Sequence, residues 1–221
     1  MGVRINDLVP DFSAETDIGS IRFHDWIDGS WVILFSHPKD YTPVCTTEFG
    51  AVAKLSDEWE KRQTKVIGLS VDSAKDHRGW KQDIESYSGK DAKFPIIADE
   101  DLAVSKAFDM FPADAYLPDG RTASDSASVR SVFIISPDKK LQLSMTYPMS
   151  IGRNFAEVLR ALDALQATYK QPIATPANWR AGEDVIVALS LDDKAAKDTF
   201  GEFDAKLPYP RLVKHDDLPY T

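Results

Sequence analysis

The sequence contains a single cysteine, Cys45, among its 221 residues. A disulfide needs two thiols, so none forms within the chain, and the CxxC motif of disulfide oxidoreductases is absent. A lone thiol is typical of a reducing compartment, although it can also bond to another molecule. A thioredoxin-like disulfide oxidoreductase is therefore disfavoured.

Long apolar runs and an excess of basic residues are also missing. The hydrophobic runs are far too short to span a bilayer, residues 1–7 lack the apolar stretch of a signal peptide, and Asn6 breaks the N-myristoylation pattern. The formal net charge is −9, with 35 acidic and 26 basic residues. Because an acidic surface repels phosphate, we expect no nucleic acid partner, no stable membrane association and a cytoplasmic location.

Apolar residues make up 43% of the sequence, which is enough for a sizeable core. Residues 31–35 form a continuous apolar run, typical of a strand buried on both faces, and residues 65–71 form a second one. Between them, apolar side chains over residues 49–59 fall at helical spacing. A strand, a helix and a strand with short connections predict a right-handed parallel crossover. A helix at about 75–87 and a strand at 94–98 extend the alternation.

The pattern changes in the second half of the chain. Residues 129–135 and 141–147 flank a turn and predict an antiparallel hairpin. Residues 154–169 predict an amphipathic helix with Asn154 as its N-cap. These elements predict an α/β core with a mixed sheet. Residues 170–179 carry two prolines and predict a linker, beyond which the tail is too short for a strong core of its own.

Cys45 lies just after the first buried strand, where the first helix is predicted to begin. Ligands of open α/β sheets bind beyond the carboxyl ends of the strands. The free N–H groups and partial positive charge at a helix start favour a thiolate, which is the nucleophilic form of cysteine. The alternative is a small buried core residue, as most free cysteines are. Position alone leaves both interpretations open.

The residues around Cys45 decide between them. The run from Pro38 to Cys45 (PKDYTPVC) matches PxxxTxxC, and residues 35–48 (FSHPKDYTPVCTTE) closely resemble the 1-Cys peroxiredoxins of the peroxiredoxin-6 subgroup. The resemblance continues in order over nearly the whole chain. It implies a thioredoxin-like α/β fold, with a mixed central sheet flanked by helices, over residues 1–169. It also implies a small C-terminal extension domain over residues 170–221, and a homodimer or higher homo-oligomer.

Each residue of the motif has a physical role beside a thiolate. Thr42 lies one helical turn before Cys45, so its hydroxyl can donate to the sulfur and accept from a peroxide O–H. Capping the helix is its alternative role. Pro38 has no N–H and can wall the sulfur off from water, or it can simply end the strand.

The resemblance implies four further site residues. It assigns the family's distant arginine to Arg130, a cation in an apolar strand that needs an anionic partner such as a thiolate. An ordinary ion pair or an edge position is the alternative. Arg153 then corresponds to a second pocket arginine, Glu48 orients Arg130, and His37 corresponds to the active-site histidine of the subgroup. Without the family, Glu48 is a favourable charge in the first turn of a helix, and His37 is a structural histidine.

A low thiol pKa does not by itself make a peroxidase. Lowering a thiol pKa from about 8.5 to about 6 raises the thiolate fraction at pH 7 roughly 30-fold, but the loss of nucleophilicity leaves a gain of only about 2–3-fold. The remaining acceleration comes from holding both peroxide oxygens in line with the sulfur and stabilising charge on the departing oxygen. Arg130, Thr42 and the backbone N–H of Cys45 are the candidate donors.

The sequence therefore predicts an antioxidant enzyme, a thiol-specific peroxidase that reduces hydrogen peroxide and organic hydroperoxides through a Cys45 sulfenic acid. No cofactor and no metal are expected. Because there is no second cysteine, an external thiol or another reductant must regenerate Cys45, and we expect excess peroxide to over-oxidise it. The alternative is a peroxide sensor or holdase chaperone with the same fold and little turnover.

Some members of the subgroup are also described as phospholipases A2. The resemblance aligns their serine, histidine and aspartate with Ser30, His24 and Asp138. The local sequence at Ser30 is DGSWV, which lacks both flanking glycines of a GxSxG motif. A nucleophile elbow needs small residues around its strained turn, so we expect little of this activity.

Overall fold

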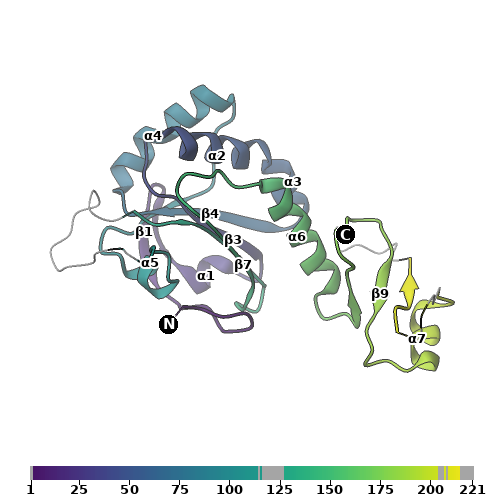
Figure 1. The fold of residues 1–221 in the computed structure, drawn as a ribbon. Coiled ribbons are helices and arrows are strands. Elements are labelled where there is room, and N and C mark those ends of the chain that lie inside the picture. The colour runs from purple at the N-terminus through teal and green to yellow at the C-terminus, as the bar shows by residue number, and fades with distance from the viewer. Residues whose placement is uncertain (1, 114, 116–126, 204–206, 208, 215–221) are drawn as a thin grey trace. The chain divides into compact units, whose positions relative to one another are not determined.

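The computed structural model describes residues 2–113, 115, 127–203, 207 and 209–214 (Figure 1). The chain divides into two compact units, Met1–Arg153 and Asn154–Thr221. The boundary expected from the sequence between the thioredoxin-like domain and the C-terminal extension domain, at residues 169 and 170, remains a prediction.

The first unit is built on a seven-stranded sheet with the order β2-β1-β5-β4-β3-β6-β7. Its strands are β1 (Ser13–Thr16), β2 (Gly19–Arg22), β3 (Trp31–Ser36), β4 (Thr64–Ser70), β5 (Ile96–Ala98), β6 (Arg130–Ile135) and β7 (Leu141–Tyr147). Strand β3 pairs in parallel with β4 and antiparallel with β6, which in turn pairs antiparallel with β7. The sheet is therefore mixed, and the predicted parallel pairing of β3 with β4 and the predicted hairpin of β6 and β7 are confirmed.

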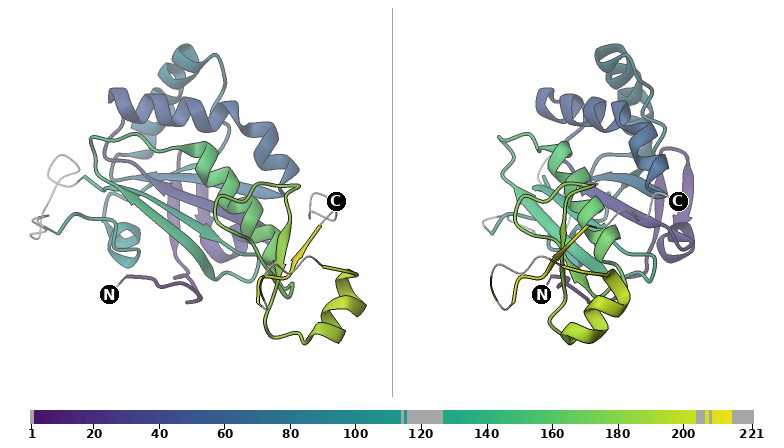
Figure 2. Two further views of the ribbon diagram at one scale, coloured as in Figure 1. Left: turned by 45° about the vertical axis from the view of Figure 1, so that its right-hand side comes forward. Right: turned by 90° about the vertical axis from the view of Figure 1, so that its right-hand side faces the viewer.

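Helices cover both faces of this sheet. They are α1 (Phe23–Ile27), α2 (Pro43–Lys54), α3 (Ser56–Lys61), α4 (Ala74–Ser88) and α5 (Ala103–Ala107). Figures 1 and 2 show α2 and α4 side by side over one face, and these two helices contact each other extensively. Helix α1 packs on the opposite face.

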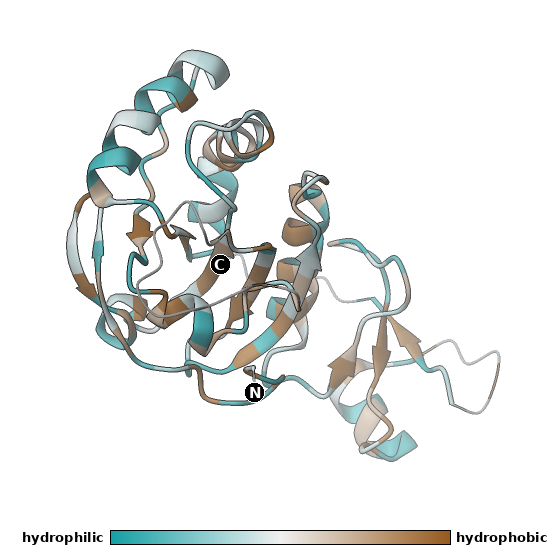
Figure 3. Ribbon diagram, turned by 60° about the vertical axis from the view of Figure 1, so that its left-hand side comes forward, coloured by the Kyte–Doolittle hydropathy of each residue, from teal (hydrophilic) through white to brown (hydrophobic). Residues whose placement is uncertain are grey.

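Strand β3 lies between these two layers. The Phe35 ring is 4.8 Å from the Phe49 ring of α2, whereas Val32 and Leu34 pack in one cluster with Phe23 of α1. Because successive side chains of a strand point to opposite faces, a strand covered on both faces needs the continuous apolar run seen in the sequence. Figure 3 shows hydrophobic residues concentrated on the central strands. Each fully buried side chain of this kind contributes about 1.5–3 kcal/mol.

The second unit contains α6 (Phe155–Thr168), β8 (Ile173–Ala174), β9 (Val185–Val187), α7 (Asp193–Phe200) and β10 (Leu212–Val213). Its strands form an antiparallel sheet in the order β10-β9-β8. The side chain of Asn154 accepts hydrogen bonds from the N–H groups of Ala156 and Glu157, which makes it the predicted N-cap. Trp179 is buried among the apolar residues of this unit. Over the described ranges, no helix is long and apolar enough to cross a membrane.

Candidate active site

The loop between β3 and α2 brings Cys45 to the carboxyl edge of the sheet. Strand β3 ends at Ser36, and α2 begins with Pro43 at its first position. Proline suits this position because its missing N–H has no helical partner there. Cys45 is the third residue of α2, and its side chain is fully buried. Its backbone N–H is among those that a helix start leaves without an intrahelical acceptor.

Strand β6 places Arg130 against the sulfur. Because β6 runs antiparallel to β3, with Val132 opposite Phe35, the first residue of β6 lies beside the end of β3. The Nη1 atom of Arg130 is 3.3 Å from Cys45 Sγ. Its Nε donates to the carbonyl oxygen of Met149 at 2.8 Å, which fixes the orientation of the guanidinium group. Arg130 and Cys45 are thus brought together across 85 residues of sequence.

Glu48 holds two arginines at this edge. Its Oε2 accepts hydrogen bonds from Arg130 Nη1 and from Arg153 Nη2, each at 2.7 Å. Its Oε1 accepts from Arg153 Nε at 2.9 Å and from the Arg153 backbone N–H at 2.7 Å. Burial alone would raise the pKa of Glu48, but the hydrogen bonds and charge of Arg153, with the charge of Arg130, lower it below the usual 4.5. The carboxylate is therefore ionised at neutral pH.

Arg153 ties this group to the sheet. Its Nη1 donates to the carbonyl oxygens of Ser36 at 2.8 Å and Ser131 at 2.9 Å, the last residue of β3 and the second residue of β6. The two guanidinium groups and the Glu48 carboxylate carry one net positive charge. A thiolate at Cys45 would neutralise that charge.

Thr42 and Pro38 lie in the loop before α2. Thr42 has the extended backbone of an N-cap residue, but its side chain caps no N–H of the helix. Its Oγ1 instead donates to the carbonyl oxygen of Lys39 at 2.8 Å. That bond occupies the hydroxyl hydrogen, so the oxygen is left to act as an acceptor. Pro38 is buried.

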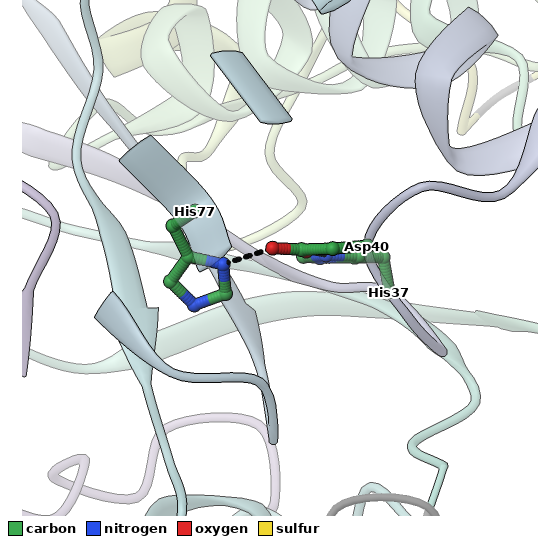
Figure 4. Close-up of side chains that lie close together, drawn as sticks. All are labelled: His37, Asp40 and His77. Carbon is green, nitrogen blue, oxygen red and sulfur yellow. Dashed lines mark hydrogen bonds and ion pairs between the residues drawn. The ribbon is translucent and has the colours of Figure 1, made fainter. Parts of the chain in front are cut away.

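His37 lies next to the motif but belongs to a second cluster (Figure 4). Its Nε2 is 2.7 Å from Asp40 Oδ1, and His77 Nδ1 is 2.6 Å from Asp40 Oδ2. Burial lowers the pKa of His37, against the opposing effect of Asp40. Two imidazoles and a carboxylate are also donor types that bind metal ions, and their ligand atoms lie within 4.8 Å of one another. Both Asp40 oxygens already pair with a histidine nitrogen, which accounts for the cluster without an ion.

Sequence analysis did not single out Asp40 or His77. Asp40 lies inside the PxxxTxxC motif, but only Pro38, Thr42 and Cys45 of that motif were assigned roles from the sequence. His77 is 37 residues further along, on α4, and nothing in the local sequence marks it as a partner. Only the pairing of β3 with β4 and the packing of α4 on α2 bring it close.

The residues that the resemblance aligned with a phospholipase site have other contacts. The Nε2 of His24 is 2.9 Å from the carbonyl oxygen of Val9, and Asp138 accepts a hydrogen bond from the Ser136 hydroxyl at 2.5 Å. The expectation of little phospholipase activity stays a prediction. Fatty-acid release by the wild type and by Ser30→Ala would test it.

Comparison with known proteins agrees with this geometry. The chain matches the AhpC/TSA family over residues 5–144 and the C-terminal domain of 1-Cys peroxiredoxin over residues 164–202. It is 46% identical to mitochondrial peroxiredoxin PRX1 of Saccharomyces cerevisiae over 215 residues, covering 96% of this chain and 81% of that protein. It is also 46% identical to peroxiredoxin-6 of Gallus gallus over 213 residues, covering 94% and 93%.

Solved structures show the same fold. A mutant of peroxiredoxin 6 of Arenicola marina superposes with a TM-score of 0.89 at 41% identity, covering 96% of this chain and 98% of that one. A yeast mitochondrial 1-Cys peroxiredoxin superposes with a TM-score of 0.87 at 45% identity, covering 96% and 100%. The predicted thioredoxin-like fold is confirmed. The chain therefore belongs to the peroxiredoxins, in the class with one active cysteine, and its activity is the thiol-dependent reduction of peroxides.

Proposed function

We propose that Cys45 attacks the peroxide as a thiolate and that Arg130 stabilises both the thiolate and the departing oxygen. The contact of 3.3 Å between Arg130 Nη1 and Cys45 Sγ is the observation that carries this assignment. A sulfur–oxygen bond forms as the O–O bond breaks. The departing oxygen takes a proton and leaves as water or an alcohol, and Cys45 becomes a sulfenic acid.

The charge of the site suits this reaction. The thiolate neutralises the single net positive charge of Arg130, Arg153 and Glu48 before the attack. During the attack that negative charge moves to the departing oxygen, and Arg130 is already in place to stabilise it. The hydrogen bonds of Glu48 and Met149 hold Arg130 still, so little reorganisation is needed.

Thr42 and Pro38 complete the proposed site. The Thr42 oxygen accepts the O–H of the peroxide, because its own hydrogen is engaged by Lys39. Pro38, which has no N–H, excludes water from the sulfur. We assign His37 to the pocket as its third polar side chain, after Arg130 and Thr42.

Stopped-flow measurement of peroxide reduction tests these roles. We expect Cys45→Ser to be inactive and Arg130→Ala to react about 10²–10³-fold more slowly, since it loses a preorganised donor. Arg180→Ala serves as a matched control, because Arg180 is exposed in the second unit. Slow oxidation of Cys45 that does not depend on Arg130 would instead favour the sensor or holdase alternative.

An external reductant must regenerate Cys45, because the chain has no second thiol. The yeast mitochondrial 1-Cys peroxiredoxin resolves its thiol through the glutathione and thioredoxin systems. We propose that one of these two thiols reduces the Cys45 sulfenic acid here. Because Cys45 is fully buried, the first turn of α2 must open to admit either one. Turnover with dithiothreitol, glutathione, thioredoxin and ascorbate identifies the reductant.

We further propose a homodimer or larger ring in the cytoplasm. Strand β7 is an edge strand of the seven-stranded sheet, and beyond Leu141, which pairs with Asn6 and Asp7, its outer edge offers backbone groups to a second copy. Light scattering on the purified chain measures the number of copies. One relative is mitochondrial, so fractionation of the source cells tests the compartment.

A further inference from the structure

The cluster of His37, Asp40 and His77 is fully buried and lies outside the arginine–glutamate group that contacts the sulfur. Figure 4 shows an oxygen of the Asp40 carboxylate facing the ring of His77, a residue of α4. Each carboxylate oxygen pairs with a different ring: Oδ1 with His37 Nε2 and Oδ2 with His77 Nδ1. The protonation of both rings follows from what each nitrogen faces.

His77 has an acceptor on each side. Its Nδ1 faces the Asp40 carboxylate at 2.6 Å, and its Nε2 faces the carbonyl oxygen of Ile97 at 3.1 Å. A carbonyl oxygen only accepts hydrogen bonds, and so does an ionised carboxylate, so both ring nitrogens must carry hydrogens. Burial raises the pKa of Asp40, but the hydrogen bonds from His37 and His77 outweigh it and lower the pKa. By this geometry, His77 is the ring that carries the extra hydrogen beside the Asp40 carboxylate.

His37 has an acceptor on one side only. Its Nε2 faces the same carboxylate, so Nε2 carries the hydrogen. Its Nδ1 is buried and has no hydrogen-bond partner among the described residues. Burial lowers the pKa of His37, so the ring is neutral and Nδ1 presents a lone pair. The charged groups facing it are Asp40 in its own loop, His77 of α4 and Asp72 after β4.

The same cluster fastens the active-site loop to α4. The Asp40 backbone N–H donates to Asp72 Oδ2 at 2.9 Å, and Asp72 is held by the Ser70 hydroxyl at 2.8 Å. The next residue, Tyr41, has a φ of 55°, in the left-handed region that non-glycine residues rarely adopt. Its hydroxyl donates to the carbonyl oxygen of Asp76 on α4 at 3.3 Å. Thr42 follows immediately.

We propose that Asp40 and His77 are positioning residues of the peroxidase site: together they hold His37 in the neutral Nε2–H form and fix the loop that carries Pro38 and Thr42. This inference rests on the proposed function, since Pro38 and Thr42 matter only if they shape the peroxide pocket. Neither positioning residue needs to touch the peroxide. The extra proton stays on His77, so His37 keeps a lone pair and adds no positive charge to the site.

Nitrogen-15 NMR of histidine-labelled wild type tests the protonation states without any substitution. The chain has only four histidines, so single His→Gln variants assign every signal. We expect His37 to be a neutral Nε2–H tautomer at pH 7 and His77 to be protonated on both nitrogens. A cationic His37 or an Nδ1–H tautomer would overturn the inference. So would a shift of both signals on adding stoichiometric Zn²⁺, because the cluster would then be a metal site.

Asp40→Leu tests the positioning role, because it removes both acceptor oxygens at similar size. The His37 and His77 rings then lose their shared partner, and the Asp40 bonds to both rings are gone. We expect Cys45 to react with hydrogen peroxide about 10–100-fold more slowly, as a slightly misplaced site does, and the rate to acquire a different pH profile. We expect the same loss for His77→Leu.

His77→Asn is the matched control, since its amide N–H can replace Nδ1–H toward Asp40. It retains most of the wild-type rate if positioning is the role. Circular dichroism confirms that each variant is folded before its rate is compared. A folded Asp40→Leu with the wild-type rate and pH profile would sink the inference. If Arg130→Ala is also without effect, the proposed function fails with it; if Arg130→Ala is slow, only the positioning role fails.

Discussion

At the scale of single residues, Glu48 links the two arginines of the site. It is buried and accepts hydrogen bonds from both Arg130 and Arg153. A buried ion pair adds little net stability when complete, but removing one partner leaves an uncompensated charge in the interior. Here the loss of Glu48 would leave two cations beside each other.

We therefore predict that Glu48→Gln lowers the free energy of unfolding by about 3–5 kcal/mol and also slows peroxide reduction. Urea unfolding followed by fluorescence measures the first effect, and stopped-flow kinetics the second. Glu58→Gln is the matched control, because Glu58 pairs with Lys61 and Arg62 at the surface and its loss leaves the unfolding midpoint nearly unchanged. Equal midpoints for the two variants would contradict the prediction.

The same residue predicts an acid sensitivity. The folded pKa of Glu48 is lower than its ordinary value of 4.5, so the unfolded state binds more protons between the two pKa values. The stability contributed by Glu48 is present above about pH 4.5 and is lost as the pH falls through the folded pKa. Urea midpoints between pH 3 and 7 should fall more steeply for the wild type than for Glu48→Gln. Parallel curves would show that Glu48 does not carry the effect.

At the scale of elements, α4 supports the loop before α2 at a point where it lacks a side chain. A Cβ atom on Gly79 would collide with the phenol oxygen of Tyr41. Glycine inside a helix costs about 0.5–1 kcal/mol relative to alanine. The chain bears the helix cost of Gly79 because the Tyr41 hydroxyl occupies the place that a side chain at position 79 would fill. Tyr41 directly precedes Thr42 in the active-site loop.

A double substitution tests this contact. We predict that Gly79→Ala gains no stability and slows peroxide reduction, because the new methyl group displaces Tyr41. In a Tyr41→Phe background, which lacks the oxygen, the same substitution should stabilise the protein by about 0.5–1 kcal/mol and leave the rate unchanged. Tyr41→Phe alone is the control. If Gly79→Ala stabilises both backgrounds equally, the contact has no importance.

The elements that could be predicted are those with strong patterns. The continuous apolar runs of β3 and β4 and the hairpin of β6 and β7 were evident because burial dictates their composition. No element was predicted before Trp31, where the structure has β1, β2 and α1. Strand β1 is mostly exposed or half-buried, β2 is exposed or half-buried throughout, and each has four residues, so neither has a clear period of buried side chains.

At the scale of the whole molecule, the single cysteine determines how the catalytic cycle fails. No thiol of the same chain can trap the Cys45 sulfenic acid, and a second copy offers only another Cys45. Because the chain forms no internal disulfide, a further peroxide competes directly with the external reductant. A second peroxide that reacts before the reductant adds another oxygen to the sulfur, because no other thiol of the chain has trapped the sulfenic acid.

We predict that peroxide without reductant converts Cys45 to the sulfenic and then to the sulfinic acid. Peptide mapping by mass spectrometry assigns the added oxygens, since the four methionines of the chain also oxidise. Adding the correct reductant should leave the peptide of Cys45 unmodified at the same peroxide dose. A peptide that stops at one added oxygen under excess peroxide would contradict this outcome.

The sequence by itself determined the nucleophile, the PxxxTxxC loop, the family and the need for an external reductant, because all of these depend on residue identity or on neighbours in the chain. Only the tertiary structure decided which groups surround the sulfur. The antiparallel register of β6 beside β3 brings Arg130 within 3.3 Å of Cys45, and the packing of α4 brings His77 to Asp40. Such distances depend on strand pairing and helix packing between distant segments, which the pattern of local residues does not encode.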